Sequence, residues 1–202
     1  MLLKQTLASI AATLLLGSFA HAADTYKVDP LHTSVSFSVR HLGINNVKGK
    51  FKEFEGTLML EGDTLKEASG TIQVKSVDTG VEKRDNHLRT ADFFDAAKYP
   101  TITFKTKRVE KDGSGQLVLI ADFTMRGVTR ELRLPAKMSK PTKDPWSGVR
   151  VGFVAKTKLN RKDYGINYNE LLETGAMAVG EEVELEIDTE AVKESAEKPG
   201  NK

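Results

Sequence analysis

The stretch HTSVSFSVRH, residues 32 to 41, alternates strictly between apolar and polar side chains and has a histidine at each end. Successive residues of a β-strand point to opposite faces, so Val35, Phe37 and Val39 share one apolar face, and His41 lies on the same side. The first histidine has the other parity. In an unbulged strand at ~3.3 Å per residue the two histidines lie about 30 Å apart, so one strand cannot make them a metal pair.

The same alternation recurs along the chain, and turn residues separate the segments. Seven further segments have this pattern: TLMLEG at 57–62, TIQV at 71–74, TITFK at 101–105, LVLIADFTM at 117–125, ELRLPAKM at 131–138, VRVGFVAKTKL at 149–159 and VELEID at 183–188. Turn chemistry lies between them in EGD at 61–63, KDGSG at 111–115, RGVT at 126–129 and KPTKDPWSG at 140–148. With the segments around Tyr26 and Val35, the pattern predicts an all-β fold of roughly eight or nine antiparallel strands, enough to close a barrel.

One segment breaks the alternation. TGVEKRDNHLRTADFFD, residues 79 to 95, begins with Thr79 and Glu82 in the spacing of a capping box. This spacing predicts a short helix of about three turns that ends near the ADFFD stretch at 91–95. Such a helix has room to lie across the mouth or the wall of a barrel.

The N-terminus is typical of an export signal. Lys4 supplies a positive charge, an apolar run follows from Leu7 to Ala20, and Ala20 with Ala22 forms an A-x-A cleavage site. The run is too short for a membrane-spanning helix, which needs ~20 apolar residues. We therefore predict a cleaved signal peptide at 1–22, one barrel domain at 23–190, a polar tail at 191–202 and no stable membrane insertion after cleavage.

Charge and cysteine content exclude several classes of function. The chain has 30 Lys and Arg against 28 Asp and Glu, and the two signs alternate without forming a basic run. This balance argues against a nucleic-acid partner. The absence of cysteine rules out thiol catalysis, Fe–S clusters and cysteine zinc sites.

No motif specifies an enzyme or a cofactor. The histidines after the signal are His32, His41 and His87, with no H-E-x-x-H spacing, and the chain has no G-x-S-x-G elbow, Walker A motif or dinucleotide fingerprint. We expect no metal, no cofactor and no catalytic residue, and a hydrogen bond from His32 near Asp29. A metal-dependent enzyme stays open as an alternative that needs the three histidines to converge in the fold.

The predicted helix is the best candidate for polar contacts with a ligand. It carries charged and polar side chains around one leucine: Arg84, Asp85, His87, Leu88 and Arg89. This set is either a solvated helix face or the polar lip of an apolar cavity, where Arg84 and Arg89 would bind an anionic or carbonyl head group. Phe93 and Phe94 are either apolar neighbours of such a ligand or plain core anchors.

Five ordered blocks resemble the YceI-like polyisoprenoid-binding proteins: VDPLHTSVSFSVRHLGINNVKGKFKEFEG at 28–56, RDNHLRTADFFDAAKYPTITF at 84–104, FTMRGVTRELRL at 123–134, DPWSGVRVGF at 144–153 and RKDYGI at 161–166. The resemblance runs from Tyr26 to about Ile187. It implies a lipocalin-like antiparallel barrel with a helix, exported to the periplasm, that holds one long isoprenoid lipid such as a quinone or a polyprenyl phosphate. It also allows a homodimer.

The alternation and the resemblance together nominate the ligand-binding residues Val35, Phe37, Val39, His41, Arg84, Asp85, His87, Leu88, Arg89, Phe93, Phe94 and Phe104. The chain has one Trp, and its inward positions are mostly Val, Leu, Ile, Ala and Thr, which leaves room inside a barrel. An eight-stranded barrel is otherwise filled by its own side chains, so a ligand-free interaction module is the other alternative.

Overall fold

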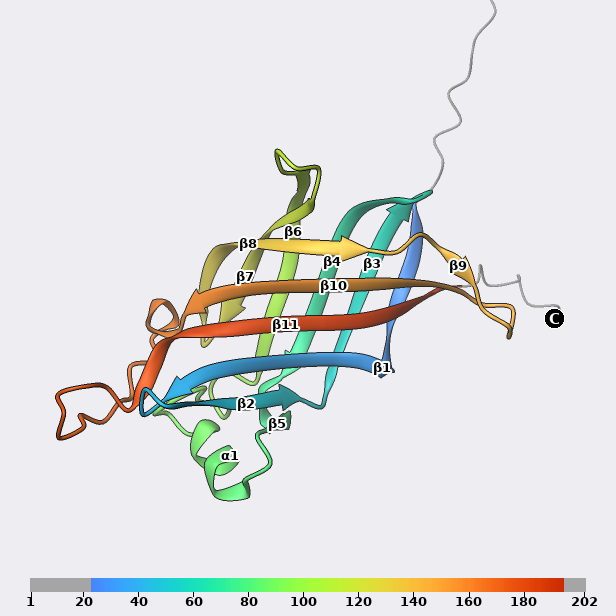
Figure 1. Ribbon diagram of the computed structural model, residues 1–202. Helices are drawn as coiled ribbons and strands as arrows, with labels where there is room; N and C mark the ends of the chain where they lie inside the picture. Colours follow the sequence, from blue (N-terminus) through green and yellow to red (C-terminus); the bar gives the residue numbers. More distant parts are fainter. Residues whose placement is uncertain (1–22, 195–202) are drawn as a thin grey trace, which may run out of the picture.

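The computed structural model describes residues 23 to 194, in which eight antiparallel strands close into a barrel (Figure 1). The strands follow the order β11-β10-β8-β7-β6-β4-β3-β1, and pairing of β1 with β11 closes the ring. Their bounds are β1 Asp24–His41, β3 Phe54–Glu61, β4 Thr64–Gln73, β6 Thr101–Lys111, β7 Leu117–Met125, β8 Val128–Met138, β10 Val149–Asn160 and β11 Val179–Lys193. The predicted all-β fold, a barrel of about eight strands with one short helix, is confirmed. The predicted signal peptide lies outside the described residues.

β1 is one long strand, where the sequence pattern suggested two. Its register against β11 shifts between Val28 and Thr33, which marks the bend visible in Figure 1. Before the bend β1 pairs with β3, and after it β1 pairs with β2 (Asn45–Phe51). The alternation did not predict β2, because Gly49 stands where an inward apolar side chain was needed. The ring of Phe37 covers that position instead.

The remaining elements are short. β5 (Val77–Asp78) pairs with β2, β9 (Thr142–Lys143) pairs with β10, and two 3₁₀ turns, η1 (Val74–Ser76) and η2 (Arg161–Tyr164), follow β4 and β10. β11 runs past residue 190, where we expected the barrel to end. Ala191 is fully buried and pairs with Val28 of β1 and Val151 of β10. It therefore belongs to β11 and to the barrel, and the tail that we predicted from 191 begins after it. The part of the predicted tail from 195 on is outside the described residues.

The helix differs from its prediction in length and in how it begins. α1 covers Glu82–Leu88, about two turns, and lies beside β5 at one end of the barrel (Figure 1). The capping box is absent, since the N-cap is Val81 and no side chain caps it. Thr79 instead donates from its amide and its hydroxyl to Asp85 Oδ1, at 2.9 and 2.5 Å. This pair satisfies the buried Asp85 carboxylate and fixes the chain ahead of the helix.

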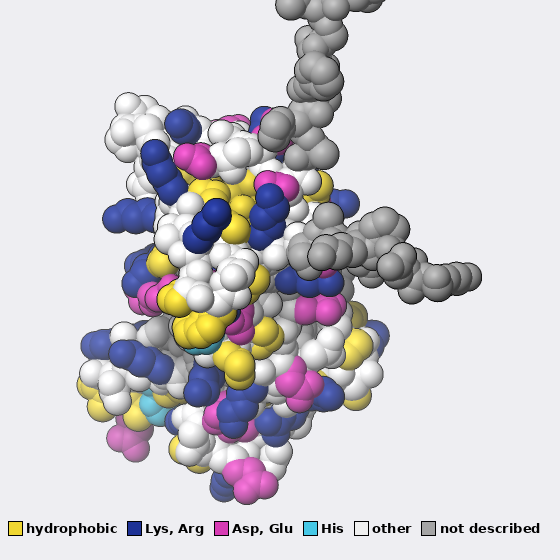
Figure 2. Space-filling view, turned by 90° about the vertical axis from the view of Figure 1, so that its right-hand side faces the viewer, with side chains coloured by type: hydrophobic (Ala, Val, Ile, Leu, Met, Phe, Trp, Pro, Cys, Tyr) yellow, Lys and Arg dark blue, Asp and Glu magenta, His cyan; other side chains and the backbone are white. Residues whose placement is uncertain are grey.

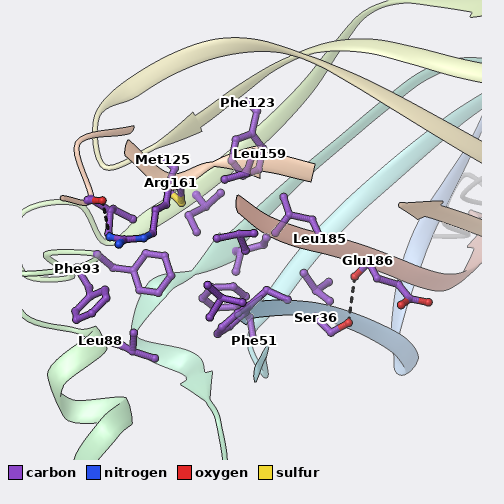
Figure 3. Close-up of a pocket in the computed structure, with 18 of the residues that line it drawn as sticks. Ser36, Phe51, Leu88, Phe93, Phe123, Met125, Leu159, Arg161, Leu185 and Glu186 are labelled. Carbon is purple, nitrogen blue, oxygen red and sulfur yellow. Dashed lines mark hydrogen bonds between the residues drawn. The ribbon is translucent and has the colours of Figure 1, made fainter. Parts of the chain in front are cut away.

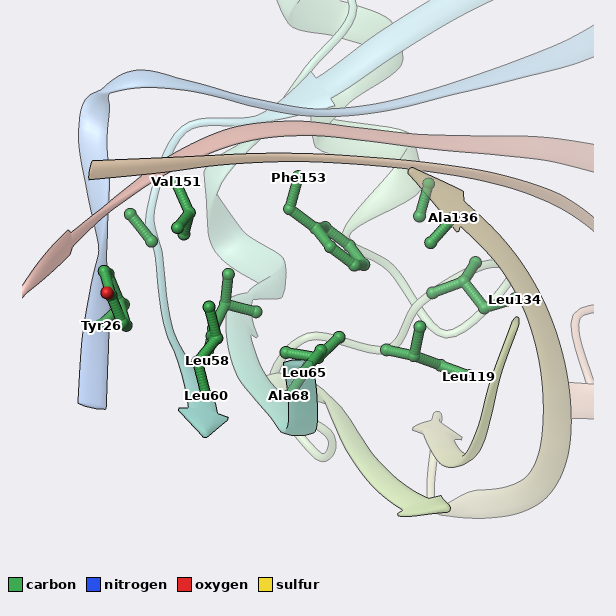
Figure 4. Packing of buried hydrophobic residues seen from close by; sticks show 12 residues of the cluster. Tyr26, Leu58, Leu60, Leu65, Ala68, Leu119, Leu134, Ala136, Val151 and Phe153 are labelled. Atoms are coloured by element: carbon green, nitrogen blue, oxygen red, sulfur yellow. The ribbon is translucent and has the colours of Figure 1, made fainter. Parts of the chain in front are cut away.

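Buried side chains form two clusters, one at each end of the barrel. The cluster away from the helix is densely filled by the residues shown in Figure 4, which include Tyr26, Leu58, Leu60, Leu65, Leu119, Leu134, Val151 and Phe153. Full burial of each aliphatic side chain contributes about 1.5–3 kcal/mol, so this end stabilises the barrel. The second cluster surrounds Phe37 and Phe51 near the helix and leaves space between its members.

The outer surface carries both charge signs close together. On the face in Figure 2, Lys and Arg side chains lie among Asp and Glu, as the alternating charges of the sequence suggested. Within residues 23 to 194, no helix has the length and apolar character needed to span a bilayer.

Candidate functional site

An apolar cavity of about 110 Å³ lies inside the helix end of the barrel (Figure 3). We call it the lumen cavity. Its apolar lining consists of Val35, Phe37, Val39, Phe51, Ile72, Leu88, Phe93, Phe94, Ile102, Phe123, Met125, Leu159, Ile166, Val179, Val183, Leu185 and Ile187. Ser36, Arg161 and Glu186 are the polar residues on its wall. In Figure 3 the Glu186 carboxylate points away from this space.

Two neighbouring strands supply one whole side of the lumen cavity. The partner of Val35 across the strand pair is Ile187, and the partner of Val39 is Val183. Phe37 is paired with Leu185 between them. Because residues of equal parity share a face, both strands direct an unbroken apolar row inward. The sequence pattern in β1 therefore placed Val35, Phe37 and Val39 on the lumen side.

Phenylalanine rings extend the apolar wall of the lumen cavity from β2 to the segment after α1. The ring of Phe51 lies 5.7 Å from that of Phe37 and 5.8 Å from that of Phe94, measured between centroids. Phe93 and Phe94 follow the end of α1, where the chain turns instead of continuing as a helix. Consecutive side chains of a helix point 100° apart, so the turn is what directs both rings to one cavity. Both residues serve as core and as cavity wall.

A second pocket, of about 240 Å³, adjoins the lumen cavity at the end of the barrel. We call it the mouth pocket, and it shares Phe37, Val39, Leu88, Phe93 and Val179 with the lumen cavity. Its other lining residues are His41, Val47, Arg84, His87, Tyr168, Glu170 and Ala178. The apolar interior thus adjoins a vestibule that has histidine, arginine, tyrosine and glutamate on its wall.

His87 is held in the vestibule by one hydrogen bond and two rings. Its Nε2 lies 2.8 Å from Asp92 Oδ2, and its ring meets Phe93 and Tyr168 edge-on at 5.1 and 4.9 Å. The Tyr168 hydroxyl donates to Glu170 Oε1 at 2.8 Å, which raises the pKa of the phenol. Sequence reasoning missed Tyr168 and Glu170, because their segment has neither strand alternation nor a motif.

The arginines of the helix segment are occupied by protein groups. Arg84 lines the mouth pocket, but its Nε and Nη2 donate to the hydroxyl and the carbonyl of Thr79 at 2.7 and 2.9 Å. Arg89 donates to the carbonyls of Lys75 and Val77 at 2.8 and 2.9 Å and lines neither pocket. The structure therefore contradicts the head-group role predicted for Arg89, which fastens α1 to the segment before it.

Two other nominated residues also lie outside the lumen cavity and the mouth pocket. The Asp85 carboxylate is buried against Thr79, where it organises the chain ahead of α1. Phe104 lies deeper in the barrel, on β6 opposite Gly70 of β4. Sequence proximity placed Asp85 with the helix lip, but hydrogen bonding within the segment turned it away from the lumen.

Arg161 is a buried polar wall residue that sequence reasoning did not single out, as it did not single out Ser36 and Glu186. It is 3% exposed, and its guanidinium donates to the carbonyls of Gly180, Ile166 and Val179 at 2.8, 2.8 and 3.2 Å. Burial lowers the pKa of this group, although arginine keeps its charge in proteins. Within the described chain no carboxylate forms an ion pair with it. A buried positive charge held by carbonyls thus lies at the cavity edge in Figure 3, near Phe93 and Met125.

A cluster of charged residues lies at the bend of β1, away from the cavity. Among residues 23 to 194, Asp29, His32 and Glu190 form the one group whose potential metal ligands lie within 4.8 Å of one another. Arg150 Nη1 already donates to Asp29 and Glu190 at 2.8 and 3.2 Å. Its guanidinium supplies the positive charge that a metal would bring, so the cluster is an ion-pair network.

This network changes the acidity of its central carboxylate. The Arg150 guanidinium, with a smaller contribution from His32, lowers the pKa of Asp29 to about 2. His32 Nδ1 lies 2.9 Å from Asp29 Oδ2, which confirms the predicted hydrogen bond near Asp29. His41 and His87 line the mouth pocket instead, so the three histidines do not converge.

The sequence of this chain is similar to those of known proteins that form one family. The model of the YceI-like domain matches residues 26–191. The chain belongs to the YceI-like family. A UPF0312 protein of Vibrio cholerae is 36% identical to it over 196 residues, covering 94% of this chain and 99% of the relative. Protein YceI of Escherichia coli O157:H7 is 37% identical over 195 residues, covering 95% and 98%.

Solved structures share this YceI-like barrel. A Campylobacter jejuni YceI protein is 30% identical, with a TM-score of 0.65, and the match covers 78% of this chain and 90% of that protein. A domain from Saccharophagus degradans, described as polyisoprenoid-binding, has a TM-score of 0.64 over 84% of this chain and 98% of its own. At 16% identity the second likeness shows the fold alone.

Proposed function

We propose that this YceI-like protein is an exported carrier without catalytic activity that holds the tail of a long-chain isoprenoid amphiphile in the lumen cavity. The observation that carries this proposal is the apolar cavity that adjoins a mouth pocket with charged and polar side chains on its wall. That arrangement matches a ligand with an apolar tail and a polar end. The A-x-A site at Ala20 and Ala22 supports export to the periplasm.

The energetics favour a binding role for the cavity. An isoprene unit has five carbons, so its burial contributes up to about 4 kcal/mol at ~0.8 kcal/mol per methylene. About three to six units are enough to reach the ~8 kcal/mol of a micromolar complex after association costs of ~4–15 kcal/mol. The tail therefore dominates the affinity, and contacts with the polar end set its orientation.

The mouth pocket favours a carbonyl or phosphate head group, as in a quinone or a polyprenyl phosphate. His41 and His87 line this pocket, and the Arg84 guanidinium adds a positive charge there while its Nε and Nη2 stay bound to Thr79. The buried charge of Arg161 makes the cavity edge more favourable for oxygen acceptors. The description of the Saccharophagus degradans domain as polyisoprenoid-binding supports the same ligand class by analogy of fold.

The test is mass spectrometry of an organic extract of the protein purified from its native host. We expect one long-chain isoprenoid in the extract of the unmodified protein. Val39→Asp places a carboxylate against the tail and should abolish this signal while the barrel stays folded. Ser38→Asp, one residue earlier on the outer face of β1, is the matched control and should retain the lipid.

An unmodified protein that neither yields nor rebinds an isoprenoid would overturn the proposal. A barrel whose interior holds only its own side chains would then favour a ligand-free interaction module. Stoichiometric zinc or iron in the purified protein would favour the metal-dependent alternative.

A further inference from the structure

Exposed apolar side chains gather at the mouth end of the barrel. Within residues 23 to 194, seven large hydrophobic side chains are exposed, and four of them lie on two neighbouring loops: Leu42, Ile44, Leu171 and Met177. We call these loops the β1–β2 turn (42–44) and the mouth hairpin (170–178). Ile44 is 77% exposed and Leu171 69%. Single exposed hydrophobic residues are common on any protein, but a group of four in one place indicates an interaction site.

Hydrogen bonds hold the β1–β2 turn and the mouth hairpin together. The Leu42 amide donates to the Ala178 carbonyl at 2.7 Å, so the turn and the base of the hairpin are direct neighbours. Leu171 and Met177 pair across the hairpin as an isolated bridge, which directs their side chains to one face. In Figure 1 the hairpin, drawn in orange, projects beyond the end of the barrel next to the turn.

The same elements form part of the mouth pocket. His41 at the end of β1 and Glu170 and Ala178 of the mouth hairpin line it. The mouth pocket and the exposed apolar side chains therefore share one end of the barrel. A surface that receives these side chains also meets the mouth pocket.

Folding alone does not explain the leucine in the β1–β2 turn. The φ angle is +52° at Leu42 and +71° at Gly43. Tight hairpin turns with positive φ favour Asn, Asp or Gly, and a bulky side chain is unfavourable there. The Leu42 side chain is exposed, so burial within the protein does not offset this cost.

The charges of the two loops balance. Arg40 and Lys48 flank the β1–β2 turn, and Glu170 and Glu173 lie in the mouth hairpin. Arg40 also donates to the Gly43 carbonyl at 2.7 Å, which fastens the turn. Equal numbers of both signs give no net attraction to an anionic membrane or to a polyanion. A zwitterionic lipid surface fits apolar side chains with balanced charge around them.

A second copy of the chain fits this surface less well than a membrane does. A stable protein interface contributes about 20–30 residues from each side, with a well-packed centre. The four apolar side chains lie on two narrow loops. A lipid surface needs no matching shape, because its molecules adapt to the side chains that enter it.

We infer that the β1–β2 turn and the mouth hairpin dock the mouth of the barrel reversibly on a zwitterionic lipid surface, where the isoprenoid amphiphile enters and leaves. This inference rests on the proposed function and names the surface that supplies its cargo. Ile44 and Leu171 enter the boundary between head groups and acyl chains, and the polar mouth pocket lies at the level of the head groups.

Flotation with phosphatidylcholine vesicles tests the docking. The unmodified protein, purified after export from its native host, should bind these vesicles equally at low and high salt. Ile44→Ser combined with Leu171→Ser should weaken binding by about tenfold or more. Leu31→Ser is the matched control, because Leu31 is 90% exposed but lies at the bend of β1, away from the mouth. It should change binding by less than about twofold.

Leu42→Asn separates docking from folding. Asn tolerates the left-handed conformation, so the melting temperature should not fall while vesicle binding weakens. A lower melting temperature with unchanged vesicle binding would show that Leu42 serves the fold and would contradict its docking role.

Transfer of a long-chain quinone separates docking from cargo binding. The double variant should take up the quinone from vesicles about tenfold more slowly and should bind as much of it when detergent delivers it. Absent vesicle binding by the unmodified protein, or equal binding by the double variant, would overturn the docking alone. A dimer of the unmodified protein that the double variant splits into monomers would also overturn it. Failure to bind quinone delivered by detergent would overturn the proposed function and, with it, the role of docking in cargo exchange.

Discussion

The ring of Phe37 lies directly over Gly49 of the neighbouring strand, where a Cβ would stand 2.3 Å from Phe37 Cζ. The two residues are register partners between β1 and β2. This contact sets the position of a ring that lines both the lumen cavity and the mouth pocket.

Gly49→Ala should therefore destabilise the barrel and displace Phe37. Inserting a methyl group into a packed contact costs typically about 1–3 kcal/mol, and in a chain of this size each kcal/mol lowers the melting temperature by about 2–4 °C. Thermal melts followed by circular dichroism measure the effect. Gly152→Ala, whose added methyl meets nothing closer than 3.7 Å, should melt like the unmodified protein. Equal melting of the two variants would show that Phe37 moves aside without cost.

Removal of the Arg161 guanidinium should be more costly. Arg161→Met leaves the carbonyls of Gly180, Ile166 and Val179 without their donor, and each unsatisfied buried group costs about 1–3 kcal/mol. We expect a loss of about 3 kcal/mol or more in the free energy of unfolding, measured with urea. Arg161→Lys should recover little, because one ammonium group does not reproduce the planar fork. Arg130→Met, at an exposed arginine, is the control.

Acid should weaken the protein through Asp29. Its pKa is about 2 in the folded state, below the ordinary aspartate value of 3.8, because Arg150 binds the charged carboxylate. A lowered folded-state pKa adds stability above the unfolded value, and this contribution is lost as the pH falls from about 4 to about 2. Asp144, whose pKa Arg150 also lowers, acts in the same direction.

Melting temperatures between pH 7 and pH 2 test this expectation. Asp29→Asn should already melt lower at pH 7 and should lose less stability between pH 4 and pH 2 than the unmodified protein. Asp63→Asn, at a carboxylate 3.9 Å from Lys140, is the control and should follow the unmodified curve. Parallel curves for all three proteins would contradict the role of Asp29.

Chelation should leave the fold intact. Arg150 already occupies the position between Asp29 and Glu190 that a cation would take. Melts with and without a chelator should coincide. A drop of several degrees on chelation would show that Asp29, His32 and Glu190 bind a metal after all.

Strand alternation predicted the parts of the site that depend on local geometry. The inward face of Val35, Phe37 and Val39 followed from the sequence, since side-chain direction in a strand repeats every two residues. The same rule failed at β2, where Gly49 interrupts the pattern because the ring of Phe37 fills its place. The prediction of a capping box was also wrong because of a contact that the local pattern does not show. The amide and the hydroxyl of Thr79 donate to the Asp85 carboxylate, so Thr79 does not cap the helix.

The sequence by itself determined the all-β class, the approximate strand number and the apolar face of β1, because each depends on periodicity or on turn residues along the chain. Tertiary structure decided which polar groups reach the lumen. Arg89 and Arg161 are both arginines beside predicted elements, yet Arg89 holds the carbonyls of Lys75 and Val77, while Arg161 is buried at the cavity wall. A long side chain reaches whichever carbonyls the barrel closure brings within hydrogen-bond distance, and that closure joins strands from opposite ends of the chain.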